Sequence, residues 1–279
     1  DSGVEKAVVN GSWLAGSVRS FLDDTDLPLE TVFQYEDKPL GTAGAVRRAL
    51  PLLGERFLVV YGDNLTRQPV TPLVRMHEKL SAEVTIALAP TGEPSSKGIV
   101  LTAPDGRITE FREKPPDEIA SSNMANSGIY VCESSVVSAL KDGDTSDFGL
   151  NVFPEMLEQG RILAAELPGG YTRDIGTLES YLIACHDLLS GRLGDPSHPA
   201  LPADGILVEN GQHLDGIDIT GTFWIEDGAL VERGCALTNC VVLSGAVVES
   251  GSCLRNTLVL PGSVVKAGTD CSEKYLSVV

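Results

Sequence analysis

Between Lys6 and Leu189, short apolar runs alternate with segments of helical periodicity. The runs have the length of strands, and segments whose apolar residues recur at helical spacing are typical of amphipathic helices. This pattern predicts strands at 6-10, 31-35, 57-61, 83-89, 97-102 and 127-132. It predicts helices at 12-22, 43-53, 70-80, 134-140, 151-159 and 178-189. The alternation indicates an α/β fold with a mostly parallel sheet that helices cover on both sides.

Pairs of glycines recur at a fixed interval in the last part of the chain. The members of each pair are six residues apart, the pairs repeat every 17 residues, and a valine keeps the same phase: Gly228, Val231 and Gly234; Gly245, Val248 and Gly251; Gly262, Val265 and Gly268. Short strands broken by turn glycines at hexapeptide spacing are typical of a parallel β-helix, whose coils bury aliphatic residues by stacking. In this register Cys240 stacks on Thr257 and Cys253 on Ala236, which explains both cysteines as small packing residues.

A segment rich in proline and glycine, about 190-206, separates the two patterns. We therefore expect an α/β domain over 1-190, a linker over 191-206 and a β-helix over 207-279. The strand at 6-10 follows Asp1 with no initiator methionine, so we expect the natural protein to begin upstream.

Composition narrows the class of protein. The chain has 279 residues, of which 42% are hydrophobic, and a formal net charge of −18. A charge of this sign argues against nucleic acid or an anionic membrane as a partner, and no apolar run is long enough to span a bilayer. The six cysteines include no Cys-x-x-Cys pair, which favours reduced thiols in a cytoplasmic protein over a zinc or disulfide framework.

A glycine-rich turn opens the helix predicted at 43-53: Pro39-Leu40-Gly41-Thr42-Ala43-Gly44. Glycine lets backbone N–H groups approach a ligand closely. The strand that follows ends at Gly62-Asp63, and ligands of open α/β sheets bind beyond the carboxyl ends of the strands. Together the turn and the strand end predict a nucleotide site.

Two aspartates are candidate metal ligands. Asp63 ends a strand, and Asp174 precedes the helix predicted at 178-189. Mg²⁺ takes one or two protein carboxylates and leaves its other positions to phosphates and water. The alternative is that Asp63 caps a turn and Asp174 caps the helix that begins near Thr177.

Further polar residues are candidates for binding a sugar phosphate. Glu113 could accept hydrogen bonds from sugar hydroxyls, and Lys114 could hold a phosphate as a point charge. Charged neighbours before a proline, here Pro115, are also typical of a solvated loop. Asn126 is either a polar anchor or a turn residue before its strand.

Six motifs occur in the order found in sugar-nucleotide pyrophosphorylases: PLGTAGA, YGD, KGIV with DGRITEFREKP, NSGIYV, DFGLNVFPEML and GYTRDIGTLESYL. The chain resembles this nucleotidyltransferase family over about residues 6-190, and its tail resembles the left-handed β-helix that many members carry. The resemblance implies a mostly parallel, Rossmann-like nucleotidyltransferase sheet that lacks its first βα unit, followed by a short C-terminal left-handed parallel β-helix.

The resemblance also implies a role for each candidate residue. Asp63 and Asp174 would bind Mg²⁺ and, with Lys114, would be the catalytic residues. The nucleotide would contact Gly41, Thr42, Ala43, Gly44, Gly62 and Asp63. The sugar phosphate would contact Gly98, Glu113, Lys114 and Asn126.

The implied substrates are a nucleoside triphosphate and a sugar-1-phosphate. A sugar-phosphate oxygen would attack the α-phosphate in line and expel pyrophosphate, so that catalysis consists of positioning and charge neutralisation. The Pro-Leu-Gly-Thr-Ala-Gly motif most resembles guanylyltransferases that make GDP-mannose from GTP and mannose-1-phosphate. A thymidylyl-, uridylyl- or adenylyltransferase acting on glucose-1-phosphate is the alternative.

One family motif does not occur in the sequence. Members carry a loop of the type G-x-G-x-R-L-x-P-L-T that cradles the triphosphate, and residues 11-16 lack its basic residue. We therefore expect this chain by itself to have little or no catalytic activity, and its sheet to have a gap or an exposed edge. A non-catalytic regulatory subunit is the second hypothesis, although the retained acidic and basic site residues favour a truncated enzyme.

A separate activity in the β-helix is the third possibility. The region after residue 217 holds no histidine for the general-base chemistry of hexapeptide acyltransferases. A structural role is therefore expected, and the ends of so short a solenoid favour a homo-oligomer.

Overall fold

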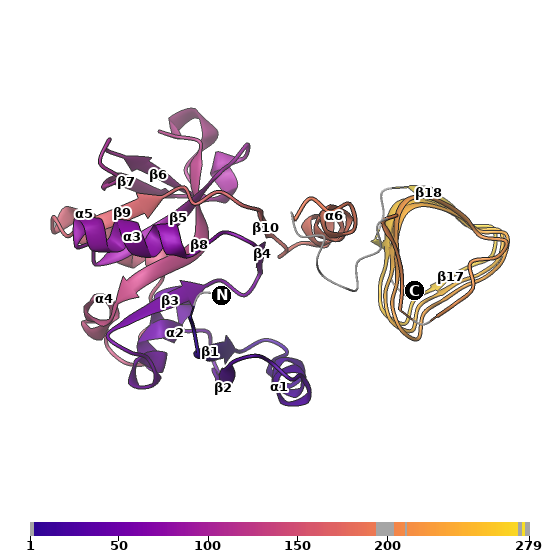
Figure 1. The fold of residues 1–279 in the computed structure, drawn as a ribbon, viewed down its shortest axis with the longest axis horizontal. Helices are drawn as coiled ribbons and strands as arrows, with labels where there is room; N and C mark the ends of the chain where they lie inside the picture. The colour runs from indigo at the N-terminus through magenta and orange to yellow at the C-terminus, as the bar shows by residue number, and fades with distance from the viewer. Residues whose placement is uncertain (1–2, 194–203, 210, 273–274, 277–279) are drawn as a thin grey trace. The chain divides into compact units, whose positions relative to one another are not determined.

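The computed structural model describes residues 3–193, 204–209, 211–272 and 275–276. The chain divides into two units, shown as ribbons in Figure 1. The first unit comprises Asp1–Gly62 and Gln68–Gly169, and the second comprises Asp63–Arg67 and Gly170–Val279. Most of the linker predicted at 191-206 lies outside the described residues, and the predicted domain boundaries remain predictions. No helix within the described ranges is both long enough and apolar enough to cross a bilayer.

Each strand and helix predicted for the first unit has a counterpart there. Its strands are β1 (Lys6–Gly11), β2 (Glu30–Tyr35), β3 (Arg56–Val60), β5 (Val84–Pro90), β6 (Gly98–Thr102), β7 (Ile108–Glu113), β8 (Met124–Glu133) and β9 (Leu163–Glu166). Its α-helices are α1 (Ala15–Asp24), α2 (Gly41–Ala49), α3 (Thr71–Leu80), α4 (Ser134–Ser138) and α5 (Phe153–Glu158). Short 3₁₀ turns cover Leu50–Leu52, Pro94–Ser96 and Asp117–Ile119, and a π-helical turn, η4, covers Phe148–Val152.

The long strand β8 organises a six-stranded sheet in this unit. β5 runs antiparallel along one edge of β8, while β3 and β6 share the other edge. β7 pairs with β6, and β9 runs parallel to β5. The α/β class is thus confirmed, and the sheet is mixed in direction. β6, β7 and β8 follow one another through connections too short for a parallel crossover, which needs a dozen or more residues.

β1 and β2 form a separate parallel pair. Among the described residues, neither β1 nor β3 has a strand partner on its second edge. Val60, near the end of β3, is 53% exposed although it continues an apolar run. The expected exposed sheet edge is therefore present in the described part of the chain.

Aromatic side chains fill the core between the sheet and α5. Tyr130 of β8 contacts Phe148 and Phe153 edge to face, with ring centroids 5.4 Å and 5.3 Å apart. Phe153 in turn meets Phe111 of β7 at 5.2 Å. Burial of large rings contributes strongly to stability, so this cluster fixes η4 and α5 against β7 and β8.

The second unit begins with a short antiparallel pair, β4 (Asn64–Thr66) and β10 (Thr172–Asp174), followed by α6 (Leu178–Leu189). Thr177 caps α6 through a reciprocal capping box with Ser180, so the helix starts where the sequence predicts. Leu182 and Cys185 on α6 are buried against the aliphatic residues of the following β-structure.

That β-structure is a parallel solenoid of about four turns, which Figure 1 shows end-on as stacked triangular coils. The pairs Cys240–Thr257 and Ala236–Cys253 confirm the predicted register. The stack starts before the glycine repeats, at β11. Its strands are β11 (Ile206–Val208), β12 (Asp218–Ile225), β13 (Leu230–Val231), β14 (Ala236–Val242), β15 (Val247–Val248), β16 (Cys253–Val259), β17 (Val264–Val265), β18 (Asp270–Ser272) and β19 (Tyr275–Leu276).

Candidate functional site

The middle of β8 is where its edge partner changes from β6 to β3. Gly128 adopts a left-handed φ of 74° there, and its N–H donates to Asn126 Oδ1 at 2.8 Å. The Asn126 amide also donates to the Tyr130 hydroxyl at 2.8 Å, and Gly128 O accepts the N–H of Tyr61. Asn126 therefore shapes the strand where its edge partner changes. Its predicted sugar contact would use what remains of its hydrogen-bonding capacity.

The glycine turn at the start of α2 packs against a later loop. Ala43 N and Gly44 N both donate to Ser146 O at 3.0 Å, and Ser146 N donates to Leu40 O at 2.9 Å. Gly41 has a φ of 75°, and a Cβ on it would stand 2.4 Å from Ser146 O. The glycines thus allow close approach to the chain's own loop, which occupies two of the N–H groups that the sequence offered to a nucleotide. Their role toward a nucleotide remains a prediction.

The carboxylate of Glu113 lies in a cradle of two glycines. A Cβ on Gly98, its cross-strand partner, would stand 2.7 Å from Glu113 Oε2, and one on Gly149 would stand 2.4 Å from the same atom. No hydrogen-bond donor among the described residues reaches this carboxylate. Two of the predicted sugar-phosphate residues, Gly98 and Glu113, are therefore together. Glu113 ends strand β7, where the sequence also allowed a solvated loop.

The surroundings of Glu113 favour its neutral form. Burial raises the pKa of its carboxyl, and the charge of Asp147 raises it further, while Lys114 lowers it. Burial likewise raises the pKa of the Tyr61 hydroxyl, which has Thr42 and Tyr130 as hydrogen-bonding neighbours. A partly desolvated carboxylate without hydrogen-bond donors around it is typical of a ligand-binding site.

Lys114 leaves the strand in an unusual backbone conformation. Its φ of 45° is in the left-handed region, which is rare for a residue with a side chain. Its N–H donates to Lys97 O at 3.0 Å, and its side chain is exposed. Strain of this kind tends to persist where surrounding structure holds a functional group in place.

Gly62 ends the first unit, and Asp63 follows it in the second.

The two predicted metal ligands lie together in the second unit. Ile175 N donates to Asp63 O at 2.8 Å, which extends the pairing of β4 and β10. A Cβ on Gly176 would stand 3.1 Å from Asp174 Oδ1 and 3.9 Å from Asp63 Oδ2, so both carboxylates reach the same small open space. Asp174 accepts the N–H of Gly176 and does not cap α6, because Thr177 does so.

A buried aspartate holds the strand that carries Asp174. Asp187 on α6 is 2% exposed and accepts the Tyr171 hydroxyl at 2.9 Å. Its carboxylate also pairs with Arg173 at 3.0 Å and with Arg192 at 3.0 Å. Three charged or polar partners satisfy this carboxylate, which fixes β10 against α6.

The donor set suits a hard divalent cation. Asp63 and Asp174 offer oxygen ligands, and Gly176 leaves open space beside them, as an ion that also binds water and phosphate requires. The described residues contain no group of three or more His, Cys, Asp or Glu side chains that could hold a metal ion on their own. Two protein carboxylates fit Mg²⁺ better than a tightly caged metal.

Sequence reasoning did not single out Glu36, which lies just before the glycine turn. Its side chain is 5% exposed, and Oε2 accepts the N–H of Leu40 at 3.2 Å. Oε1 has no hydrogen-bond partner among the described residues. A buried acceptor without a partner is costly unless a ligand satisfies it. The one feature of the sequence that could have indicated Glu36 is its place as an acidic residue between an apolar strand and Pro39.

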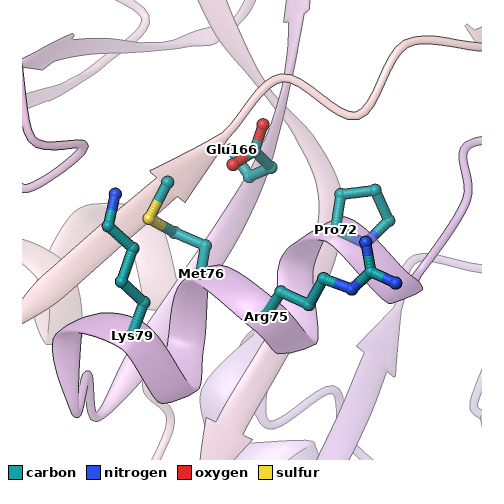
Figure 2. Close-up of a pocket in the computed structure, with 5 residues that line it drawn as sticks. All are labelled: Pro72, Arg75, Met76, Lys79 and Glu166. Atoms are coloured by element: carbon teal, nitrogen blue, oxygen red, sulfur yellow. The ribbon is translucent and has the colours of Figure 1, made fainter.

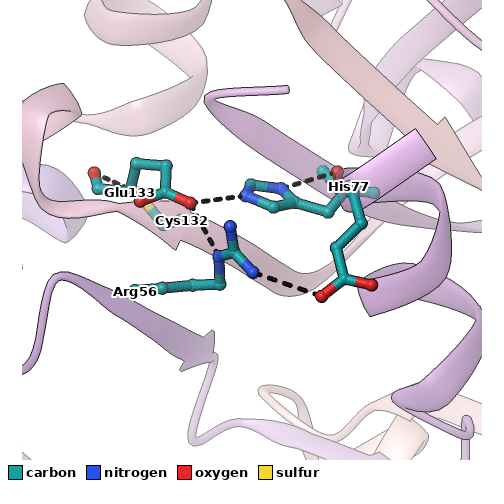
Figure 3. A network of polar contacts seen from close by, with 6 residues as sticks. Arg56, His77, Cys132 and Glu133 are labelled. Carbon is teal, nitrogen blue, oxygen red and sulfur yellow. Dashed lines mark hydrogen bonds and ion pairs between the residues drawn. The ribbon is translucent and has the colours of Figure 1, made fainter. Parts of the chain in front are cut away.

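Two open cavities in the first unit lie elsewhere. One, of about 220 Å³, is bordered by Pro72, Arg75, Met76 and Lys79 of α3 with Glu166 of β9 (Figure 2). The other, of about 400 Å³, adjoins Arg56, His77 and Glu133 (Figure 3). Neither cavity is lined by a residue predicted for the site.

Figure 3 shows how His77 is held. Its Nδ1 lies 3.0 Å from Thr85 Oγ1, and its Nε2 lies 3.0 Å from Glu133 Oε1, which also accepts from Arg56 at 2.7 Å. A hydroxyl, a histidine and a carboxylate in sequence could suggest catalysis. Thr85 is completely buried, however, so its hydroxyl cannot contact a substrate. The network ties α3 to β5 and β8.

The first unit has an α/β fold, and the second unit contains a parallel β-solenoid. Two crystal structures described as HddC from Yersinia pseudotuberculosis share the fold with a TM-score of 0.57 at 23% identity. The similarity covers 67% of this chain and 80% of theirs, and one is described as complexed with GMP-PN.

Residues 1–191 match the nucleotidyl transferase family, and the chain belongs to that family. A UTP–glucose-1-phosphate uridylyltransferase of Synechocystis is 27% identical over 276 residues, covering 86% of this chain and 71% of its own. A mannose-1-phosphate guanylyltransferase catalytic subunit beta of Drosophila pseudoobscura pseudoobscura is 31% identical, covering 85% and 61%. A glucose-1-phosphate adenylyltransferase of Desulfitobacterium hafniense is 35% identical, covering 53% and 40%. The chain thus spans less than two thirds of the last two relatives.

Proposed function

We propose that this chain belongs to an enzyme that makes GDP-mannose from GTP and mannose-1-phosphate. The observation that carries the proposal is the convergence of Asp63 and Asp174 beside Gly176, in a chain of the nucleotidyl transferase family. In the reaction, an oxygen of the sugar phosphate forms a bond to the α-phosphorus of the triphosphate. The bond from that phosphorus to the bridging oxygen breaks, and pyrophosphate leaves with its electrons.

Bound Mg²⁺ would neutralise phosphate charge, with Asp63 and Asp174 as its protein ligands. The remaining work falls to the protein's own residues. Glu113 would accept hydrogen bonds from sugar hydroxyls, and the exposed amine of Lys114 would neutralise the sugar phosphate. The turn at Gly41–Gly44 would support the nucleotide.

Glu36 supports guanine as the base. A carboxylate only accepts hydrogen bonds, and guanine presents two adjacent donors, N1–H and the exocyclic amino group, on one edge. Uracil and thymine present a single ring N–H on that edge, and adenine presents only its amino group. A pocket with an acceptor in need of donors discriminates strongly between such bases. Oε1 of Glu36 is an acceptor of this kind.

The alternative within the family is a glucose-1-phosphate uridylyl-, thymidylyl- or adenylyltransferase. Relatives with uridylyl- and adenylyltransferase names match this chain as well as guanylyltransferases do. A non-catalytic regulatory subunit remains the second hypothesis. A homo-oligomer formed through the solenoid and a cytoplasmic location also remain predictions.

Binding of the product tests the proposal without requiring turnover. The chain is titrated calorimetrically with GDP-mannose, UDP-glucose and ADP-glucose, each with Mg²⁺. GDP-mannose is expected to bind at least about tenfold more tightly, which is about 1.4 kcal/mol. Glu36→Gln should narrow this preference, because the amide replaces one acceptor with a donor, and Asp37→Asn is the matched control at an exposed neighbour. A preference for UDP-glucose would replace the guanine assignment, and binding of none would contradict the proposal.

A further inference from the structure

Asp147 contacts both the glycine turn that opens α2 and the start of η4. Its Oδ2 accepts the Thr42 hydroxyl from the glycine turn at 2.7 Å. Its Oδ1 accepts the N–H groups of Gly149 at 2.9 Å and Leu150 at 3.0 Å, which begin η4. Gly149 is one of the two glycines that cradle Glu113. One carboxylate therefore links the turn to the support beneath Glu113.

The link between the turn and the loop is reciprocal. Thr42 Oγ1, which donates to Asp147, also accepts the N–H of Phe148 at 2.9 Å. Beside it, Ser146 O accepts the N–H groups of Ala43 and Gly44, and Ser146 N donates to Leu40 O. A threonine hydroxyl used in both directions, with backbone bonds on either side, fixes the relative position of the two segments.

Capping η4 alone does not require this residue to be charged. Asn, Ser and Thr serve as helix caps about as well as Asp. A second carboxylate beside Glu113 opposes the ionisation of Glu113, whose other charged or titratable neighbours are Lys114 and Tyr61. Asp147 therefore places a charge that disfavours the ionisation of Glu113, which a neutral cap would not do.

We propose that Asp147 is a positioning residue that holds the glycine turn and Glu113 in one geometry, so that a nucleotide sugar meets a preformed site. The inference rests on the proposed function for the identity of the ligand. Asp147 itself touches no substrate in this scheme. It acts through Thr42 on the nucleotide side and through Gly149 on the sugar side.

The test measures two quantities on the full 279-residue chain: the Kd of GDP-mannose with Mg²⁺, and the pKa of Glu113 by carboxyl NMR without ligand. Asp147→Asn is expected to weaken binding about tenfold and to lower the pKa of Glu113. Thr42→Val should weaken binding to a similar degree, and Thr42→Ser should restore it. Asp144→Asn removes an exposed charge from the same loop and should change neither quantity.

The outcomes separate this inference from the proposed function. Unchanged binding in Asp147→Asn, or failure of Thr42→Ser to restore what Thr42→Val loses, overturns the positioning role. If the wild-type chain binds no nucleotide sugar, the proposed function fails. The ligand-free titration then decides the role alone, and a pKa of Glu113 that is the same in wild type and Asp147→Asn overturns it. If Asp147→Asn does not fold, Asp147→Ser, which keeps a cap for η4 without the charge, replaces it in both measurements.

Discussion

The carboxylate of Glu113 rests against the backbone of Gly149, so closely that a Cβ there would stand 2.4 Å from Oε2 and 3.1 Å from Cδ. Glu113 comes from the end of β7, and Gly149 lies within η4. The aromatic cluster of Phe111, Tyr130 and Phe153 holds these two elements together. The Glu113 carboxylate is therefore placed by the absence of a side chain at Gly149 as much as by the residues that pack around it.

Alanine at either supporting glycine should move Glu113. In Gly149→Ala the nearest atom to the new Cβ is the flexible end of Glu113, which can turn away. In Gly98→Ala the core ring of Phe111 stands as close to the new Cβ as Glu113 does, at 2.7 Å. We expect GDP-mannose to bind both variants about tenfold more weakly, a loss of about 1.4 kcal/mol. The melting temperature should change little in Gly149→Ala and fall in Gly98→Ala, because the Phe111 ring must shift. Gly92→Ala, where a Cβ meets no atom within 4 Å, is the control for calorimetry. Unchanged affinity in both variants would remove Glu113 from the binding site.

Alanine at Gly41 should instead destabilise the fold. Its φ of 75° disfavours a side chain by about 1–2 kcal/mol, and its Cβ would stand 2.4 Å from the backbone oxygen of Ser146, which cannot turn away. Gly143 has a φ of 84° but open space around its Cβ, so Gly143→Ala shows the cost of backbone strain alone. Chemical denaturation should show a larger loss in the free energy of unfolding for Gly41→Ala than for Gly143→Ala. Equal losses would mean that the Ser146 backbone shifts at little cost.

Glu113 should make folding stability depend on pH. Burial and the charge of Asp147 raise the pKa of Glu113 in the folded state. Ionisation therefore costs more in the folded than in the unfolded chain, and this penalty develops as pH rises from the unfolded pKa through the folded pKa. Glu113→Gln removes the penalty, so it should be more stable than wild type at pH 7 and gain less at pH 4. Denaturation at both pH values checks this, and a gain that does not grow with pH would contradict it.

Loss of either metal-ligand candidate should weaken binding of a divalent cation. Mn²⁺ is a paramagnetic substitute for Mg²⁺, so its binding can be followed by electron paramagnetic resonance with the nucleotide present. Asp63→Asn and Asp174→Asn each remove one of two carboxylates, and we expect at least a tenfold loss of affinity, about 1.4 kcal/mol. Asp142→Asn changes an exposed acid in the first unit and serves as the control. Retained binding in both site variants would exclude this pair.

Much of the fold can be predicted from the local periodicity of hydrophobic residues and glycines. The helix predicted at 178-189 matches α6, and the solenoid register follows from glycines 17 residues apart, because both depend on periodicity within one segment. The sequence did not predict β7 or β10. β10 is stabilised by pairing with β4, more than a hundred residues earlier, whereas β7 pairs with the neighbouring strand β6. Charged residues within β7 and β10 give no apolar alternation.

The sequence alone determined the residue types of the site: two aspartates, a glutamate beside a lysine, and a glycine turn. Tertiary structure decided which of them meet and what they meet. It brought Asp63 to Asp174 through strand pairing across more than a hundred residues, and it gave the turn's N–H groups to Ser146. It also left Oε1 of Glu36 without a hydrogen-bond partner in the part of the chain that the structure describes. A sequence carries the chemistry of each side chain, but only packing between distant segments determines its burial, its neighbours and the hydrogen bonds left for a ligand.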